Sequence, residues 1–315
     1  MSTIFAPFIW LFNRLEDLVS WILITFHSLL SPVFGETSGW SWSLSIIGLV
    51  IVIRIALIPL FVKQIRAVRN MQAIQPQIKE LQKKYADNRE KLGQEMMKLY
   101  RETGTNPFSS CLPILLQAPI FFALFRVLQG IALNKPEGIF ANANNIDLID
   151  QAREALVVGV PIYATLLNAD ETPSATSTIV LTVFLIIFMS ATTFITQRQL
   201  IVKNSAPNNP MVQQQKILLY VFPIIFAVGG IGFPIGVLIY WSTTNLWSMF
   251  QQFWVIRNSP TPGSPAYDAW QQRKQEKRRK KGIADEPQPK PEEEQPPAPR
   301  QQPKKQPRQK RKKKK

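Results

Sequence analysis

The chain has 315 residues, a formal net charge of +16 and a hydrophobic fraction of 46%. Its mean hydropathy is close to zero, but charged residues are concentrated after residue 257 and long stretches before it carry almost none. That division excludes a single soluble globule. One Cys and one His are too few for an internal disulfide or a His/Cys metal site, so we expect no metal and no cofactor.

The N-terminal segment, residues 5–34, is apolar and aromatic but carries polar side chains at helical spacing. They are Asn13, Arg14, Glu16, Asp17, Ser20, His27, Ser28 and Ser31. One polar stripe along an apolar helix is typical of a helix that lies in the membrane interface. We therefore predict an amphipathic interfacial helix within residues 1–39. The alternative is a sixth membrane span or a signal anchor.

Uncharged runs predict five membrane-spanning helices, because one span needs about 20 mostly apolar residues. Arg54 and Arg126 are the charged residues within these runs. The last run is uncharged over residues 217–256 and has three glycines near its middle, which predicts two spans joined by a turn. The predicted spans are residues 43–62, 108–131, 177–196, 217–232 and 234–256.

The charge of the loops predicts the orientation of these spans. Residues 63–106 carry ten Lys and Arg against five acids, residues 197–216 carry three against none, and residues 257–315 carry nineteen against seven. Residues 132–176 carry two against six acids. We therefore predict that the three basic segments and the C-terminus are cytoplasmic and that residues 132–176 form an external loop.

The first cytoplasmic segment, residues 63–106, has the pattern of a helical hairpin. Apolar residues repeat every three or four positions on both sides of a break at residues 87–88, and Gly104 marks the expected end of the second helix. Pro76 is expected to bend or interrupt the first arm. The apolar stripes either pack on each other or bind a partner. They comprise Met71, Ile74, Ile78, Leu81, Tyr85, Leu92, Met96, Leu99 and Tyr100.

Polar side chains within the spans gather in the halves nearest the cytoplasm. Gln117 lies near mid-membrane in the second span, whereas the outer halves are almost purely apolar. This pattern predicts an aqueous cavity that opens to the cytoplasm and is closed to the outside. The inner halves of the third and fifth spans contribute Ser190, Thr192, Thr193, Thr196, Tyr240, Ser242, Thr243, Thr244, Asn245 and Ser248.

Arg54 lies about 12 Å from the cytoplasmic end of its span at helical rise. A charge at that depth costs roughly 2.5 kcal/mol or more, and none of the five predicted spans contains Asp or Glu. Arg54 must therefore be solvated by water, by hydroxyls and amides, or by an acidic group from elsewhere. In the alternative interpretation it snorkels to the interface, which is also our expectation for Arg126 near the outer end of its span.

Four segments together resemble the YidC/Oxa/Alb membrane protein insertases. They read IRIALIPLFVKQ, MQAIQPQIKELQKKY, TGTNPFSSCLPILLQAPIFFALFRVL and FPIGVLIYWSTTNLWSMFQQ. The resemblance covers residues 40–256 and is greatest to forms from Gram-positive, high-GC bacteria. It implies an all-α, polytopic protein of the bacterial plasma membrane that is not an enzyme. It also implies a five-helix core, an interfacial helix before it, and a hydrophilic groove that bears Arg54.

The resemblance implies that the protein inserts and helps fold nascent membrane proteins, alone or with the Sec translocon. The alternatives are a transporter or channel that uses the same polar cavity, and a chaperone that only packs helices released by the translocon. The candidate groove residues are Arg54, Gln117, Thr192, Thr193, Tyr240, Trp241 and Asn245.

The tail, residues 257–315, is rich in Pro, Gln and Lys and is predicted to be disordered. Its lysine blocks suit the phosphate backbone of ribosomal RNA, with anionic lipid headgroups as the alternative partner. The candidate partner-binding residues on the hairpin and the tail are Lys79, Lys83, Lys84, Arg278, Arg279, Lys280 and Lys281.

Overall fold

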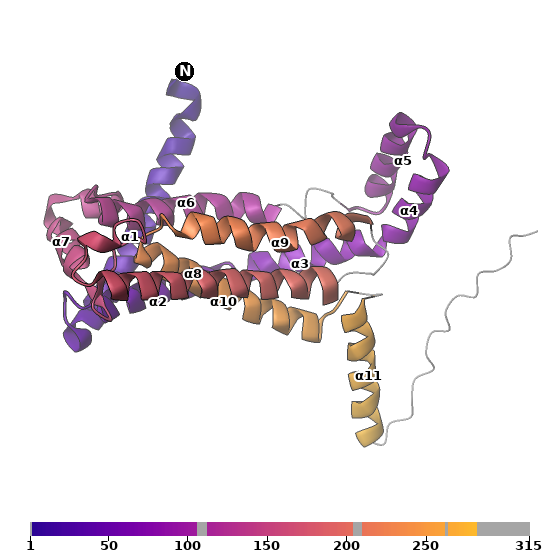
Figure 1. The fold of residues 1–315 in the computed structure, drawn as a ribbon. Coiled ribbons are helices and arrows are strands. Elements are labelled where there is room, and N and C mark those ends of the chain that lie inside the picture. The colour runs from indigo at the N-terminus through magenta and orange to yellow at the C-terminus, as the bar shows by residue number, and fades with distance from the viewer. Residues whose placement is uncertain (1, 106–111, 204–209, 262–263, 282–315) are drawn as a thin grey trace, which may run out of the picture. The chain divides into compact units, whose positions relative to one another are not determined.

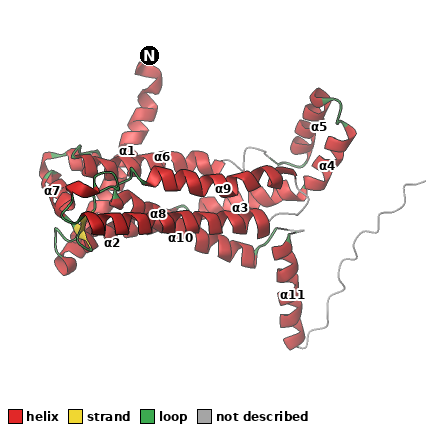
Figure 2. Ribbon diagram, viewed as in Figure 1, coloured by secondary structure: helices red, strands yellow, loops and turns green. Residues whose placement is uncertain are grey.

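A computed structural model describes residues 2–105, 112–203, 210–261 and 264–281. Residues 1–270 form one compact unit and residues 271–315 a second. The described chain is mainly helical (Figures 1 and 2). Residues 108–111 of the predicted span 108–131 lie outside the described residues, and a helix begins at Leu112.

The first predicted span is divided between two helices, α2 (Gly39–Ala56) and α3 (Ile58–Ala73). The break lies at Leu57, whose N–H still donates to the Ile53 carbonyl at 3.0 Å. Pro59 explains the break, since its ring lacks an N–H and collides with the carbonyl of the residue four positions earlier. Helix α3 therefore follows α2 after a break of one residue, which the run of uncharged residues did not predict.

Helices α4 (Gln75–Lys84) and α5 (Arg89–Glu102) follow α3 and contact each other. Pro76 lies in the first turn of α4, where proline is tolerated, so it begins a new helix rather than bending an old one. Asn88 caps α5 by accepting a hydrogen bond from the Lys91 N–H at 2.9 Å. Gly104 has a φ of 61° just beyond the end of α5, where glycine is favoured.

The apolar stripes of α4 and α5 cover each other only in part. Ile78 is buried, but Leu81, Leu92 and Leu99 stay partly exposed. A cleft of about 250 Å³ lies between the two helices, with Leu81 and Leu99 among charged side chains in its wall. The helix pair therefore retains accessible apolar surface.

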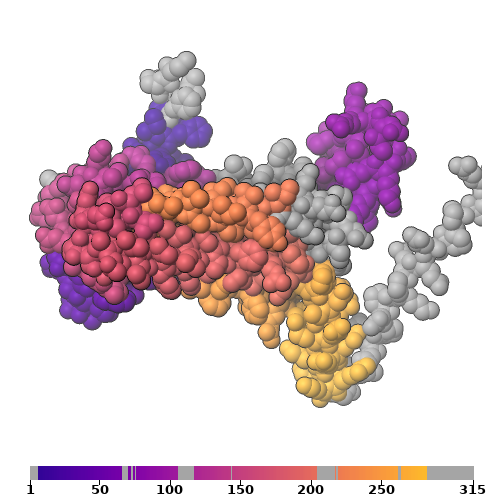
Figure 3. All heavy atoms as spheres, viewed as in Figure 1, coloured from indigo at the N-terminus to yellow at the C-terminus, as the bar shows by residue number. Residues whose placement is uncertain are grey.

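Four further long helices are α6 (Leu112–Leu133), α8 (Ala175–Arg198), α9 (Pro210–Gly230) and α10 (Ile235–Asn258). A short π-helix, η5 (Gln199–Lys203), continues α8. Helix α8 packs against α9 and α10, and α10 also contacts α2 and α6. Figure 3 shows α9 covering one side of α8 in this unit.

Three helices among the described residues are long and apolar enough to cross a membrane. They are Ala6–Phe34, Gly39–Ala56 and Ala175–Lys203, and a shorter apolar helix covers Leu219–Gly230. The third predicted span, residues 177–196, thus lies within a helix of suitable length and composition. A complete five-span core remains a prediction.

The segment between α6 and α8, predicted as an external loop over residues 132–176, contains several short elements. They are η2 (Gly138–Ala141), η3 (Ala143–Asn145), α7 (Asp147–Glu154), the antiparallel strands β1 (Leu156–Val157) and β2 (Val160–Pro161), and η4 (Ala169–Glu171). Arg153 donates to the Ile131 and Ala132 carbonyls at 3.2 and 2.5 Å. It thereby satisfies carbonyl groups at the end of α6 that lack helical partners.

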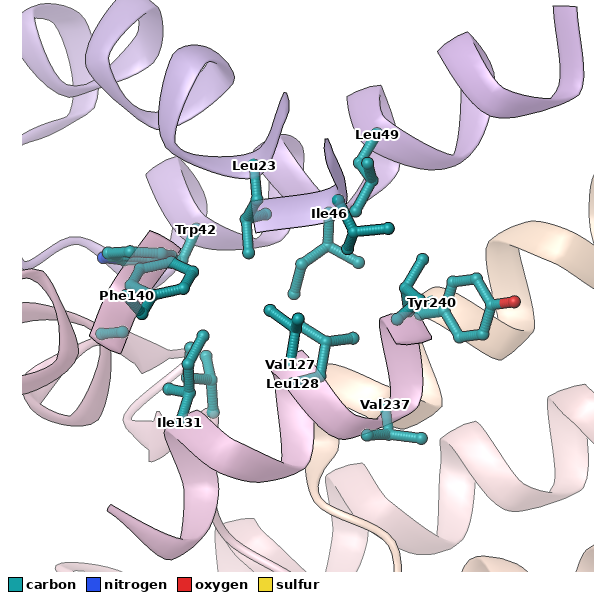
Figure 4. Close-up of a cluster of buried hydrophobic side chains, with 14 of the residues drawn as sticks. Leu23, Trp42, Ile46, Leu49, Val127, Leu128, Ile131, Phe140, Val237 and Tyr240 are labelled. Atoms are coloured by element: carbon teal, nitrogen blue, oxygen red, sulfur yellow. The ribbon is translucent and has the colours of Figure 1, made fainter. Parts of the chain in front are cut away.

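The main core forms where α1 (Ser2–Phe34), α2, α6, α10 and η2 meet (Figure 4). Trp42 is fully buried there and stacks on His27 with ring centroids 4.0 Å apart. The ring nitrogens of both residues hydrogen-bond the Glu36 carbonyl, so their polar atoms are satisfied despite burial. The other labelled core residues are Leu23, Ile46, Leu49, Val127, Leu128, Ile131, Phe140, Val237 and Tyr240.

Part of the polar stripe of α1 faces the protein rather than water. Glu16, Ser20 and His27 are each at most 3% exposed, and Ser20 Oγ accepts a hydrogen bond from the Ile139 N–H at 3.0 Å. These three polar residues are therefore covered by the rest of the protein, and the location of α1 in the membrane interface stays a prediction. The helix itself, and its amphipathic character, are present.

Arg126 does not simply snorkel to the interface. Its guanidinium lies 3.2 Å from Glu16 Oε1 and 2.6 Å from Glu137 Oε1. It thus joins α6 to α1 and to the segment that precedes η2. We call Glu16, Arg126 and Glu137 the outer clamp, and sequence reasoning missed it because Glu16 lies far from the other two residues in the chain.

The beginning of the predicted disordered tail is helical. Residues up to Asn258 belong to α10, and α11 covers Pro265–Lys280 with no buried residue. Composition had suggested disorder because this stretch cannot build a core, yet many of its residues are good helix formers. Residues 282–315 lie outside the described part of the chain.

We predict that Gly39→Ala destabilises the protein, because an added Cβ would collide with the Leu156 backbone carbonyl. Overpacking of this kind costs about 1–3 kcal/mol, so the midpoint of thermal unfolding in detergent should fall. Gly93→Ala is the matched control, since nothing lies within 4 Å of its added Cβ in α5. That change should leave the midpoint unchanged or raise it. An unfolding midpoint for Gly39→Ala at or above the wild-type value would contradict the packing described for α2 and β1.

Candidate functional site

The arginine predicted as the centre of a groove lies in the last turn of α2. Arg54 is buried, with 8% of its surface exposed. Its Cζ atom lies 5.6 Å from the centroid of the Phe61 ring. Phe61 is seven residues further along, which is two helical turns, so both side chains lie on one face across the Leu57 break. That spacing was visible in the sequence, but Phe61 was not recognised as a neighbour of Arg54.

The positive charge of Arg54 has no acidic partner among the described residues. Helices α2, α6, α8, α9 and α10 contain no Asp or Glu. No described carboxylate lies within ion-pairing distance of the Arg54 guanidinium. Tyr240 of α10, which is 4% exposed, interacts electrostatically with the Arg54 guanidinium.

Magnitudes show that Arg54 is incompletely compensated. A cation–π contact contributes about 0.5–2 kcal/mol, whereas insertion of an arginine at mid-helix costs roughly 2.5–3.5 kcal/mol. The Phe61 ring offsets only part of that cost. The remaining cost is not offset by any carboxylate among the described residues.

The structure brings Thr193 and Asn245 together at the contact between α8 and α10. Asn245 Nδ2 donates to Thr193 Oγ1 at 2.8 Å and to the Met189 carbonyl at 3.2 Å. Thr192 is 5% exposed, and its hydroxyl donates to the Phe188 carbonyl of the same helix at 2.8 Å. These polar groups thus have partners within the protein, and Asn245 stays partly exposed.

Trp241 lies in an aromatic cluster rather than beside Arg54. Its ring centroid is 5.1 Å from that of Phe121 on α6, 4.8 Å from Phe226 on α9 and 5.5 Å from Phe233. Gln117 lies on α6 one turn before Phe121 and is partly exposed. A single groove lined by all seven candidate residues remains a prediction.

The candidate partner-binding residues fall on two separate helices. On α4, Lys79 is partly exposed and Lys83 and Lys84 are exposed, and Lys84 Nζ lies 5.3 Å from the Tyr85 ring centroid. On α11, Arg278, Arg279 and Lys280 occupy the last turn, and Lys281 follows. Lys83 and Lys84 on α4 and the basic residues of α11 lie at helix C-termini, where the helix dipole favours cations.

The comparisons with known proteins agree on one family. Residues 33–262 match the sequence profile of the family described as 60Kd inner membrane protein. A Streptomyces avermitilis protein named membrane protein insertase YidC is 50% identical over 272 residues, which cover 84% of this chain and 63% of that relative. A protein of the same name from Tropheryma whipplei strain Twist is 38% identical over 283 residues, which cover 85% of this chain and 88% of the relative.

Among solved structures, the chain resembles a crystal structure described as an active YidC insertase with the first transmembrane domain resolved. The TM-score is 0.46 at 19% sequence identity, and the match covers 76% of this chain and 46% of that one.

We predict that Thr193 and Asn245 are energetically coupled. In a double-mutant cycle of Thr193→Val and Asn245→Ala, the coupling should be about 0.6–1.7 kcal/mol, the range of interhelical hydrogen bonds in membranes. The measurement is the free energy of unfolding in detergent for the four proteins. Thr243→Val with Thr193→Val is the control cycle, because the Thr243 hydroxyl donates to Ile239 of its own helix, and should give a coupling near zero. Equal couplings in both cycles would contradict the α8–α10 contact.

Proposed function

This chain belongs to the YidC family of membrane protein insertases, and we propose from that membership and from Arg54 that it inserts nascent proteins into a bacterial membrane and helps them fold. The observation that carries the proposal is the buried guanidinium without a described carboxylate partner. Insertion makes and breaks no covalent bond, so the protein acts without enzymatic chemistry. The relatives named insertase favour this function over a transporter or channel.

In the proposed mechanism, Arg54 assists the part of a substrate that is hardest to move. The external segment of a nascent membrane protein is hydrophilic and often acidic, and apolar lipid opposes its passage. A groove open to the cytoplasm shortens the apolar distance, and Arg54 pairs transiently with carboxylates of that segment. The apolar helix of the substrate then partitions into lipid, which contributes about 25 cal/mol per Å² of buried apolar surface.

The proposed orientation places α1 in the outer interface. Figure 1 shows α1 running across the direction of α2, α6, α8 and α10 rather than alongside them. At 3.6 residues per turn, its exposed surface has an aliphatic strip with Leu11, Leu18 and Leu29. A wider strip of polar side chains and tryptophans adjoins it, as suits a helix in the membrane interface. This strip contains Trp10, Asn13, Arg14, Asp17, Trp21, Thr25 and Ser28.

The partners beyond nascent chains are also proposals. Cooperation with the Sec translocon would let the protein pack helices that the translocon releases, and a chaperone role is compatible with insertion. The basic residues of α11 and the segment after it suit ribosomal RNA or anionic lipid. Co-sedimentation with ribosomes, compared with binding to anionic vesicles, separates these two partners.

The charge of Arg54 predicts a substrate-dependent defect. Arg54→Lys should retain much of the activity, whereas Arg54→Ala and Arg54→Glu should insert an acidic-headed substrate about tenfold less efficiently or worse, since a charge-assisted hydrogen bond contributes about 1.5–3 kcal/mol. The measurement is protease protection of a short substrate after insertion into liposomes that contain only the purified protein.

The control substrate carries Asn and Gln in place of the acidic residues of its head, and it should be much less sensitive to all three variants. If Arg54→Glu inserted the acidic substrate as well as the wild-type protein does, the electrostatic mechanism would be wrong. Ion flux without insertion would instead favour a channel.

A further inference from the structure

The turn between β1 and β2 has an unusual residue at its first position. Val158 has a φ of 52° and Gly159 a φ of 79°, as in the two-residue hairpin turns that favour Asn-Gly. A β-branched residue with a positive φ is a genuine outlier, because its side chain is crowded by its own backbone. Val158 is also 68% exposed, so packing against the described part of the protein covers only a minor part of this strained residue.

The surroundings of this turn are apolar and uncharged. Residues 155–167 contain no Asp, Glu, Lys or Arg, although the rest of the segment 132–176 carries eight. Val157 and Val160 face inward, at 7% and 0% exposure, while Leu156 is 43% exposed. The hairpin therefore has an inner side that packs on the protein and an apolar outer side formed by Leu156 and Val158.

The hairpin is attached to the beginning of α2. Leu156 forms a parallel β-bridge with Ser38, and its carbonyl group lies directly against Gly39. Gly39 is the first residue of a helix that is long and apolar enough to cross a membrane. Leu156 and Val158 are thus held at the depth where α2 begins, which is the region where a membrane span meets the lipid headgroups.

The neighbouring helix ends also carry exposed apolar residues. Trp40 in the first turn of α2 is 54% exposed, and Phe34 at the end of α1 is 45% exposed. A tryptophan at the end of a span is typical of the membrane–water interface. The short strands lie close to this end of α2 in Figure 2.

We propose that Leu156 and Val158 form a membrane anchor that inserts into the lipid headgroup region beside the start of α2. The occupant of this surface is the bilayer that α2 itself enters. Removal of two apolar side chains from water offsets the strain of Val158, and the absence of charge over residues 155–167 removes the main obstacle to contact with lipid. The anchor fixes the depth of the segment that covers this end of the helices.

Fluorescence quenching tests the depth of the turn. Cys111→Ser removes the native cysteine, and Val158→Cys then carries an environment-sensitive fluorophore in vesicles of phosphatidylethanolamine and phosphatidylglycerol. Lipids with a nitroxide near the headgroup should quench the label at residue 158 at least twice as strongly as aqueous iodide does. Asn144→Cys on η3, an exposed position, is the control and should show the opposite order.

Two results would overturn the anchor. Equal accessibility of residues 144 and 158 to iodide would place the turn in water, and protection of residue 158 from both quenchers would place it against protein. The variant Val158→Asn tests the role of the side chain itself. Asparagine suits this turn, so the variant should fold, yet a label at Leu156→Cys should lose at least half of its quenching by nitroxide lipid. Unchanged quenching at residue 156 would show that Val158 does not hold the hairpin in the membrane.

Discussion

The cost of a buried arginine without an acidic partner is the constraint on which the rest of this structure depends. Arg54 receives the face of the Phe61 ring and lies near the Tyr240 side chain. Neither neighbour carries a negative charge, so most of the free-energy cost of burying the Arg54 charge is not offset. No described carboxylate offsets it either. We propose that a carboxylate of the substrate pairs with Arg54 during insertion.

Arg126 shows a contrasting arrangement in the same protein, because two carboxylates lie beside its guanidinium. Arg126 pairs with Glu16 and Glu137 at 3.2 and 2.6 Å, and these contacts join three segments of the outer clamp. A permanently paired arginine holds structure together, because breaking one contact leaves a charge unmatched. Arg54 lacks such contacts among the described residues, and we propose that it pairs transiently with a substrate. The difference between the two residues separates a structural role from the proposed functional one.

Local patterns in the sequence predicted helices and helix ends, because these depend mainly on residues close together in the chain. Residues 177–196 lie within α8, the predicted break at residues 87–88 separates α4 from α5, and Gly104 follows the end of α5. The sequence did not reveal contacts between distant segments. The outer clamp joins residues more than a hundred positions apart, and the inward orientation of Glu16, Ser20 and His27 depends on the helices that α1 meets. Trp241 was predicted as a groove residue, but its aromatic contacts are Phe121 on α6, Phe226 on α9 and Phe233 in the turn before α10.

The most direct test of the account is whether water reaches the polar contact between α8 and α10 from the cytoplasmic side. In a Cys111→Ser background, Asn245→Cys should react with a membrane-impermeant maleimide added to that side, because a thiol needs water to form its reactive thiolate. A cysteine at Val183, whose side chain is 37% exposed on the predicted outer half of α8, should react from neither side. A stalled substrate should protect residue 245. Absence of labelling at residue 245, or labelling of both positions from both sides, would contradict a cavity open only to the cytoplasm.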